Sequence, residues 1–200
     1  MKANKAVFIE KSETLERVVV ELGPGGRRKY GGSITIDRLP LDEVDIVADL
    51  GQGMGFIPDA TVDLIYSSHF LEHIDDLEML FREFQRVLKP GGRVISVVPH
   101  FSNPYFYSDY THRNFWGLYT PFYFSSNNLY KRTVPRFYND IDLDVESIYI
   151  RFKSPFRFRR HIKKMLGKLF NMNKYMQELY EENFCYLFPA YELEIAMLKR

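Results

Sequence analysis

The chain has 200 residues, enough for one domain with a full hydrophobic core. Its net charge of +1 and hydrophobic fraction of 46% are those of an ordinary globular protein, and they give no reason to expect a nucleic-acid partner. Cys185 is the single cysteine, which excludes an intramolecular disulfide and a cysteine-cluster metal centre. No apolar run is long enough to span a membrane, so we expect a cytoplasmic protein.

Short β-branched runs in the first half predict buried strands of a parallel sheet. They are Arg17–Leu22, Ser33–Asp37, Val44–Leu50, Val62–Ser67 and Arg93–Pro99. Apolar residues at helical spacing predict one helix, Leu77–Leu88, between the last two strands. Asp75 or Asp76 is its expected N-cap, and Lys89-Pro90-Gly91-Gly92 its expected stop signal.

The second half carries weaker patterns. Residues 101–124 are rich in aromatic side chains and predict a long loop that acts as a lid. Leu143–Phe152 and Tyr191–Lys199 alternate as two further strands, and about 153–180 between them predicts a basic helical insertion. The whole chain is thus predicted to be a single α/β domain. It would be doubly wound, with a mostly parallel seven-stranded sheet and a helical insertion before the last strand.

A glycine-rich turn, Glu21-Leu22-Gly23-Pro24-Gly25-Gly26, follows the first strand. Ligands of open α/β sheets bind at such strand ends, although a tight connecting turn without a ligand has the same signature. A dinucleotide would require a third glycine where Arg28 stands, and a helix where only Arg27–Gly32 is available. The turn therefore favours a ligand without a pyrophosphate.

Two aspartates end the next strands. Asp37 could accept hydrogen bonds from ribose hydroxyls, and Asp49 from an adenine amine. Each could instead cap a turn or helix. Together with the glycine turn they predict a nucleoside pocket that lacks phosphates.

Five segments resemble the Rossmann-like, class I S-adenosylmethionine-dependent methyltransferases of type 11. The segments are ELGPGG (21–26), TID (35–37), ADL (48–50), DLIYSSHFLEHI (63–74) and RVLKPGGRVISVVP (86–99). The resemblance covers the first half of the chain and implies S-adenosylmethionine as cofactor. It implies that Glu21, Gly23 and Gly25 line the methionine part, that Asp37 holds the ribose, that Asp49 and Leu50 meet the adenine, and that Ser67 and Ser68 flank the sulfonium. The near absence of the first crossover helix departs from the family pattern.

Methyl transfer to a hydroxyl needs a proton acceptor, for which histidine is suited. His112 or His100 is the predicted base, with Asp109 orienting it or sharing the role, although each histidine could be structural. His69 and His73 flank Glu72, but their order is not that of a zinc helix and no third ligand is evident. We therefore expect no metal.

The acceptor is predicted to be a small molecule, such as a hydroxyl of a sugar or a lipid-linked glycan. The aromatic residues of 105–124 could wall its pocket or simply pack the loop. Two alternatives are a nucleotide- or NAD-binding enzyme and a non-catalytic, membrane-associated relative.

The segment Arg151–Gln177 has nine Lys or Arg residues and no Asp or Glu. Its apolar residues share one helical face: Phe158, Ile162, Met165, Leu166, Leu169 and Phe170. Such a helix could lie on an anionic membrane surface through 153–176, at the inner face of the membrane, or bind a phosphate-bearing acceptor. It could also pack its apolar face on the domain.

Overall fold

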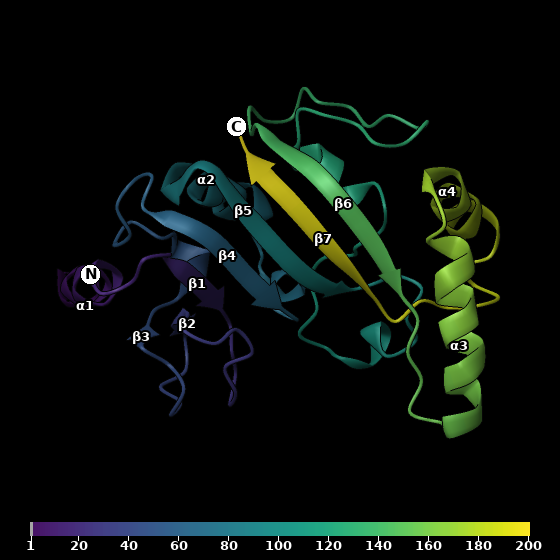
Figure 1. The fold of residues 1–200 in the computed structure, drawn as a ribbon, viewed down its shortest axis with the longest axis horizontal. Coiled ribbons are helices and arrows are strands. Elements are labelled where there is room, and N and C mark those ends of the chain that lie inside the picture. The colour runs from purple at the N-terminus through teal and green to yellow at the C-terminus, as the bar shows by residue number, and fades with distance from the viewer. Residues whose placement is uncertain (1) are drawn as a thin grey trace.

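The computed structural model describes residues 2–200. Seven strands form one sheet in the order β3-β2-β1-β4-β5-β7-β6 (Figure 1). Strands β1 to β5 pair in parallel, whereas β7 runs antiparallel between β5 and β6. The predicted fold, a mostly parallel seven-stranded sheet with a helical insertion before its last strand, is confirmed.

The strands are β1 Val19–Leu22, β2 Ile34–Asp37, β3 Ile46–Val47, β4 Val62–Ser68, β5 Leu88–Pro99, β6 Leu143–Arg151 and β7 Glu192–Lys199. The α-helices are α1 Lys2–Glu13, α2 Leu77–Val87, α3 Arg157–Phe170 and α4 Lys174–Asn183. Short 3₁₀ turns are η1 Leu50–Gln52, η2 Leu71–His73, η3 Phe106–Ser108 and η4 Thr120–Phe124.

The sheet reverses its order beside β1. Leu22 at the end of β1 pairs with Ile36 of β2 on one side and with Ser67 of β4 on the other. The chain thus leaves β1 in one direction and later returns to fill the other side. Ligands of open α/β sheets bind at this kind of reversal, outside the carboxyl ends of the strands.

Helix α2 forms where it was predicted. Asp76 is its N-cap and accepts a hydrogen bond from the Met79 amide at 2.9 Å. Its buried face packs on the sheet, and each such large apolar side chain contributes roughly 1.5–3 kcal/mol. The helix ends at Val87, directly before the predicted stop signal, and Leu88 is its C-cap. Lys89–Gly92 is an irregular start of β5, between the pairings of Leu88 with Val62 and of Arg93 with Leu64.

Two elements near the N-terminus differ from expectation. Helix α1, which no sequence pattern predicted, is anchored by fully buried Phe8 and by the Asn4 side chain, which donates to the Val47 carbonyl at 3.1 Å. Strand β3 is shorter than the predicted Val44–Leu50. The reason is that Asp49 caps η1, whose first residue is Leu50.

The aromatic segment 101–124 divides into two parts. Trp116 and Phe122 are buried in the core, and Phe124 stacks on Phe81 of α2 with ring centroids 4.2 Å apart. These side chains pack the loop onto the domain, so the predicted lid contracts to residues 105–115, where Tyr110 is 93% exposed.

Helices α3 and α4 lie beyond the β6 edge of the sheet (Figure 1). Asn171 between them accepts from the Ile150 amide and donates to the Ile150 carbonyl, both at 2.8 Å, and Gln177 donates to the Ile148 carbonyl at 2.7 Å. The insertion therefore satisfies backbone groups of an edge strand that would otherwise be open to pairing. Within residues 2–200 no helix is long and apolar enough to cross a membrane.

Candidate functional site

The glycine turn lies at the sheet reversal, as predicted. Its amide at Gly23 donates to the Ile36 carbonyl at 2.9 Å, and both Gly23 and Gly25 have positive φ, +59° and +61°. A Cβ at Gly23 would lie 2.5 Å from Cδ2 of Phe70, so the turn is pressed against that ring. A Cβ at Gly25 would meet no atom within 4 Å, so this side of the turn faces open space that a ligand can fill.

The loop that replaces the first crossover helix is held by Glu21. This carboxylate is buried and accepts from the Lys29 amide at 3.0 Å, the Tyr30 amide at 2.9 Å and the Ser33 hydroxyl at 3.2 Å. Residues 27–33 contain no helix, in agreement with the prediction from their length. Glu21 thus fixes the loop beside the turn, and its expected place along the methionine part remains a prediction.

The two aspartates hold backbone amides. Asp37 accepts from the Gly25 amide at 3.3 Å and from the Leu39 amide at 3.0 Å, so it orients the glycine turn itself. Asp49 accepts from the Gly51 amide at 3.0 Å as the cap of η1. Asp37 therefore lies at the turn, whereas Asp49 lies past the end of the short β3, with the Leu50 backbone beside it.

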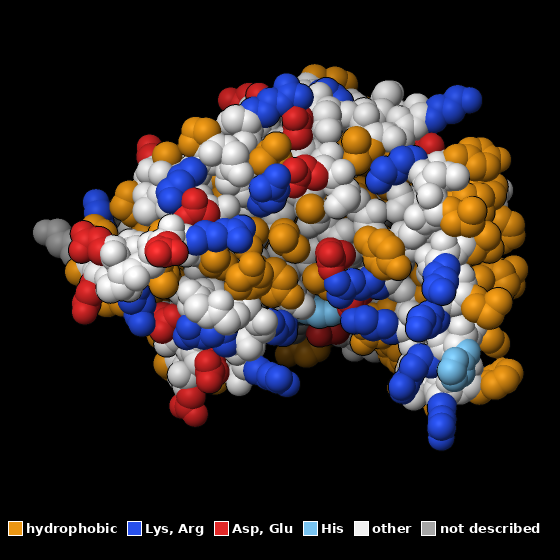
Figure 2. Space-filling model, in the orientation of Figure 1, with side chains coloured by type: hydrophobic (Ala, Val, Ile, Leu, Met, Phe, Trp, Pro, Cys, Tyr) orange, Lys and Arg blue, Asp and Glu red, His pale blue; other side chains and the backbone are white. Residues whose placement is uncertain are grey.

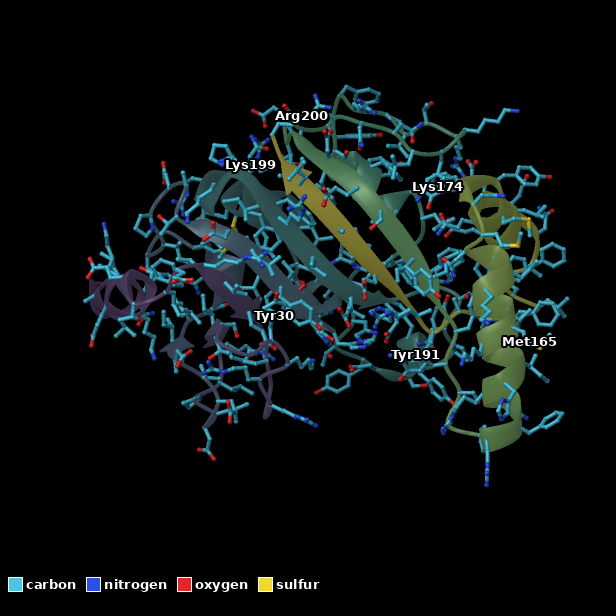
Figure 3. All side chains as sticks on the ribbon, viewed as in Figure 1. Tyr30, Met165, Lys174, Tyr191, Lys199 and Arg200 are labelled. Carbon is cyan, nitrogen blue, oxygen red and sulfur yellow. The ribbon has the colours of Figure 1, made fainter. Side chains whose placement is uncertain are left out.

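The serines at the end of β4 have different surroundings. Ser67 is fully buried and donates to the Ser96 hydroxyl at 2.9 Å across the sheet. The Ser68 carbonyl accepts from the Lys29 side chain at 3.2 Å, which ties the loop of residues 27–33 to β4. Tyr30 from that loop and Tyr191, directly before β7, both lie at this end of the sheet (Figure 3).

A charged cluster that the sequence did not predict surrounds His69, directly after β4. Its ring nitrogens lie 3.2 Å from Glu72 and 3.3 Å from Glu192. Pairing with Glu192 and with Glu72 raises the pKa of His69 to about 9, so the ring is a cation at neutral pH. Its backbone has φ +56°, a conformation that non-glycine residues rarely adopt.

Glu192 is the hub of this cluster. It contacts His69, Arg151 at 3.1 Å and Lys153 at 2.5 Å. Burial opposes its ionisation, but the hydrogen bonds from His69, Lys153 and Arg151 outweigh that effect and lower its pKa to about 2. The cluster joins the ends of β4, β6 and β7, so it appears only after the sheet has assembled.

His112 lies next to this cluster, on the predicted lid. Its Nδ1 is 2.9 Å from the Phe106 carbonyl, which can only accept, so Nδ1 carries the hydrogen and Nε2 keeps a free lone pair. Nε2 lies 3.6 Å from Asp109. The rings of His112 and His73 meet edge to face, 4.9 Å apart. This is the tautomer that a general base requires.

Asp109 also orders the lid around His73. It accepts from the Thr111 hydroxyl at 2.6 Å, which lowers the pKa of Asp109, and Thr111 in turn can only accept from Nδ1 of His73 at 3.0 Å. Glu72, His73 and His112 each offer one ligand atom within 4.8 Å of the others. The fold thus places His112 beside Glu72 and His73 as a third potential metal ligand, a grouping that the sequence did not reveal.

His100 is fully buried and has a different environment. The Ser102 amide donates to its Nδ1 at 3.1 Å, so the hydrogen is on Nε2, which donates to Glu181 at 3.1 Å. Glu181 also accepts from the Leu118 amide at 2.7 Å. His100 therefore joins β5 to α4 inside the core, and its geometry supports a structural role and not that of the predicted base.

The predicted cofactor residues come together, since Glu21, Gly23, Gly25, Asp37, Ser67 and Ser68 all lie at the carboxyl ends of β1, β2 and β4. The missed residues are Glu72, Glu192, Arg151 and Lys153. The sequence did place Glu72 between two histidines, which was the one available signal.

Residues 34–96 match the family model described as a methyltransferase domain. Phosphoethanolamine N-methyltransferase 3 of Arabidopsis thaliana is 53% identical over 38 residues, which is 19% of this chain and 8% of that protein. A sterol 4-C-methyltransferase of Caenorhabditis elegans is 44% identical over 54 residues, 27% of this chain and 16% of that protein. The matched segments are thus a small part of these relatives' length.

Solved structures extend the likeness to the whole fold. A methyltransferase structure from Archaeoglobus fulgidus superposes with a TM-score of 0.55 at 18% identity, over 99% of this chain and 92% of that one. The sheet order with its antiparallel β7, the glycine turn at the reversal and the matched family model agree. The chain therefore carries a methyltransferase-domain match over residues 34–96 and has the overall fold of a solved S-adenosylmethionine-dependent methyltransferase.

Proposed function

We propose that this chain binds S-adenosylmethionine at the glycine turn and methylates a small-molecule acceptor that approaches from the side of His112. The observation that carries the proposal is the open space at Gly25, at the reversal of the sheet and beside Asp37. The bound cofactor supplies a methyl group on a positively charged sulfur. The remaining tasks, which are binding, orientation and proton removal, belong to side chains of this chain.

The residues around the turn fit a nucleoside with no phosphate chain. Asp37 already accepts two amide hydrogen bonds and, as a carboxylate, has lone pairs left for ribose hydroxyls. Residues 27–33 form no helix N-terminus that would hold a pyrophosphate, which weighs against the nicotinamide alternative. Glu21, Gly23, Asp49, Leu50, Ser67 and Ser68 complete the proposed contacts.

His112 is the proposed base for an acceptor hydroxyl. Its Nε2 lone pair would take the hydroxyl proton as the oxygen attacks the methyl carbon and the carbon–sulfur bond breaks. Asp109, whose pKa is lowered, stays ionised and stabilises the protonated ring. The exposed rings of Tyr105, Tyr107 and Tyr110 on the lid suit stacking on a sugar, which supports a sugar or lipid-linked glycan hydroxyl as acceptor.

Calorimetric titration with S-adenosylmethionine tests the cofactor site. The unmodified chain should bind, and Asp37→Ala should weaken binding by about tenfold or more, because a charge-assisted hydrogen bond to ribose is lost. Asp42→Ala is the matched control, since Asp42 is an exposed aspartate in the next loop. Equal affinity of all three proteins would refute the assigned pocket.

A further inference from the structure

Helix α3 has two apolar sides, and only one of them packs on the protein. Phe170 is buried on the inner side, where its ring lies 4.9 Å from Tyr180 of α4 and 6.0 Å from Phe152 after β6. The sequence predicted one apolar face on this helix. In the structure its apolar residues fall into a buried inner group and an exposed outer group, because α3 touches the domain only through its inner side.

The outer side forms a continuous exposed stripe. Phe158, Ile162, Met165 and Leu169 recur every three or four residues and are 79%, 45%, 71% and 44% exposed. Met172 and Tyr175, each 69% exposed, continue the apolar surface towards α4. Figure 2 shows hydrophobic side chains gathered along this outer border, and Met165 points away from the sheet in Figure 3. We name these six residues the outer stripe.

The charges on α3 itself, beside the outer stripe, all have one sign. Arg157, Lys164 and Lys168 run along one flank of α3, and Arg159 lies on the other. Between Glu146 in β6 and Glu178 in the middle of α4 the sequence has no acidic residue. An exposed apolar stripe between rows of cations is the pattern of a helix that lies in the plane of an anionic lipid surface.

We propose that the outer stripe docks this protein on an anionic lipid membrane, with the long axis of α3 parallel to the surface. Its apolar side chains would enter the boundary between head groups and acyl chains. The lysine and arginine stems would extend sideways to reach lipid phosphates. Docking of this kind needs no membrane-crossing helix, and α3 with 14 residues is too short to be one.

A second copy of the chain fits the outer stripe less well. A symmetric dimer through this surface would bring Arg157, Lys164 and Lys168 of one copy close to the same residues of the other. Because Arg151–Gln177 contains no Asp or Glu, none of these cations would find an acidic partner from the same segment. The repulsion disfavours self-association and the same charges favour lipid phosphates.

The inner side of the N-terminal half of α3 borders a cleft of about 420 Å³. Ile162 belongs both to this cleft and to the outer stripe, and Lys153, Arg159 and Lys163 lie around the cleft. Tyr191 also lines the cleft, and it directly precedes Glu192 of the His69 cluster. Figure 2 shows a hollow in this region with Lys and Arg side chains along its border. Docking would present this cleft to an acceptor with an acyl chain and an acidic head group. This step rests on the proposed function.

Co-sedimentation with vesicles tests the docking without any methyl transfer. Vesicles of phosphatidylcholine with about one-third phosphatidylserine should bind the protein at about 0.05 M salt, and pure phosphatidylcholine vesicles should bind it at least tenfold more weakly. Binding should fall again at about 0.5 M salt, where charges are screened. Equal binding to both vesicle types, or no binding at low salt, would overturn the proposal.

Variants locate the surface. Phe158→Glu with Met165→Glu should reduce vesicle binding by about tenfold or more, since apolar insertion is lost and charge repulsion is added. Phe137→Glu is the matched control, because Phe137 is also 79% exposed but lies outside α3, and it should bind like the unmodified chain. Equal loss in both variants would contradict the assigned surface.

Two further measurements distinguish membrane docking from self-association and from a damaged cofactor site. Sedimentation velocity should show the same mass for the unmodified chain and the double variant. If the unmodified chain were a dimer that does not bind vesicles, and the double variant were a monomer, the outer stripe would be a contact with a second copy instead. The double variant should keep its affinity for S-adenosylmethionine, so that a failure of docking and a failure of the cofactor site give different results.

Discussion

The turn after β1 and the cluster around His69 lie at the same end of the sheet but are built in different ways. In the turn, hydrogen bonds join residues that are close in sequence. Gly25 pairs with Asp37, 12 residues away, and Glu21 pairs with Lys29, 8 residues away. In the cluster, His69 meets Glu192, and Glu192 meets Arg151 and Lys153. The first arrangement is local in sequence, and the second exists only because β7 returns antiparallel between β5 and β6.

This difference separates the proposed cofactor site, whose partners are close in sequence, from the proposed acceptor side, whose partners are distant. Partners that are close in sequence create a motif that can be recognised. An example is a glycine-rich turn followed by an aspartate at the end of the next strand. Distant partners leave no motif, although they determine the charge of the site. The acceptor side is therefore the part that experiments on this protein must define.

Substitution at the two glycines of the turn should have the largest effect on stability. Gly23→Ala should lower the free energy of unfolding by about 3 kcal/mol, because the new Cβ would lie 2.5 Å from the Phe70 ring in addition to the left-handed strain. Gly25→Ala should cost only about 1 kcal/mol, since its Cβ meets open space. Urea denaturation measures both, and equal losses would contradict the close approach of Phe70.

Substitution of the proposed base should have the next largest effect. His112→Ala should lower kcat by about 100-fold with a hydroxyl acceptor, while its affinity for S-adenosylmethionine stays unchanged. His100→Ala should instead lower the midpoint of thermal unfolding, because it leaves Glu181 without its buried partner. Release of S-adenosylhomocysteine and differential scanning calorimetry distinguish the two. An unchanged rate in His112→Ala would remove that residue from the mechanism.

The charged cluster can be tested through the pKa of His69. Glu192→Gln should lower this pKa from about 9 by about one unit or more, because the strongest partner of the ring loses its charge. Glu194→Gln is the control: Glu194 also contacts Arg151 but not His69, so the pKa should hardly move. NMR titration of the ring measures it, and an unshifted pKa in Glu192→Gln would dismiss the pairing.

A smaller effect is expected on the pH dependence of stability. The folded-state pKa of His69, about 9, lies above the unfolded value of 6.5, so its contribution is complete below pH 6.5 and is lost as pH rises through 9. The free energy of unfolding should therefore fall across this window in the unmodified chain and fall less in His69→Gln. Parallel curves for the two proteins would show that the ring gains nothing from its carboxylates.

Prediction from sequence succeeded where a pattern is periodic or local. The sheet, α2 with Asp76 as one of its two candidate caps, and the lack of a helix over 27–32 all followed from such patterns. Helix α1 was missed because Phe8 is the one fully buried side chain among its described residues 4–13, which leaves no apolar periodicity to detect.

Other differences arise from tertiary contacts. His100 and His112 are both histidines in or near the aromatic segment, and only the fold shows that the first is enclosed by Ser102 and Glu181. The apolar residues of α3 satisfied one helical pattern, yet the domain covers only the side that carries Phe170. Which side of an amphipathic helix is covered depends on neighbours that the sequence pattern does not contain.

A crystal structure of the chain with S-adenosylhomocysteine would test the central claim most directly. We predict ribose hydroxyls within hydrogen-bond distance of Asp37, the amino-acid part against Gly23 and Gly25, and the sulfur directed towards His112. A ligand bound elsewhere, or a ribose that leaves Asp37 bonded only to the amides of Gly25 and Leu39, would contradict the assigned site.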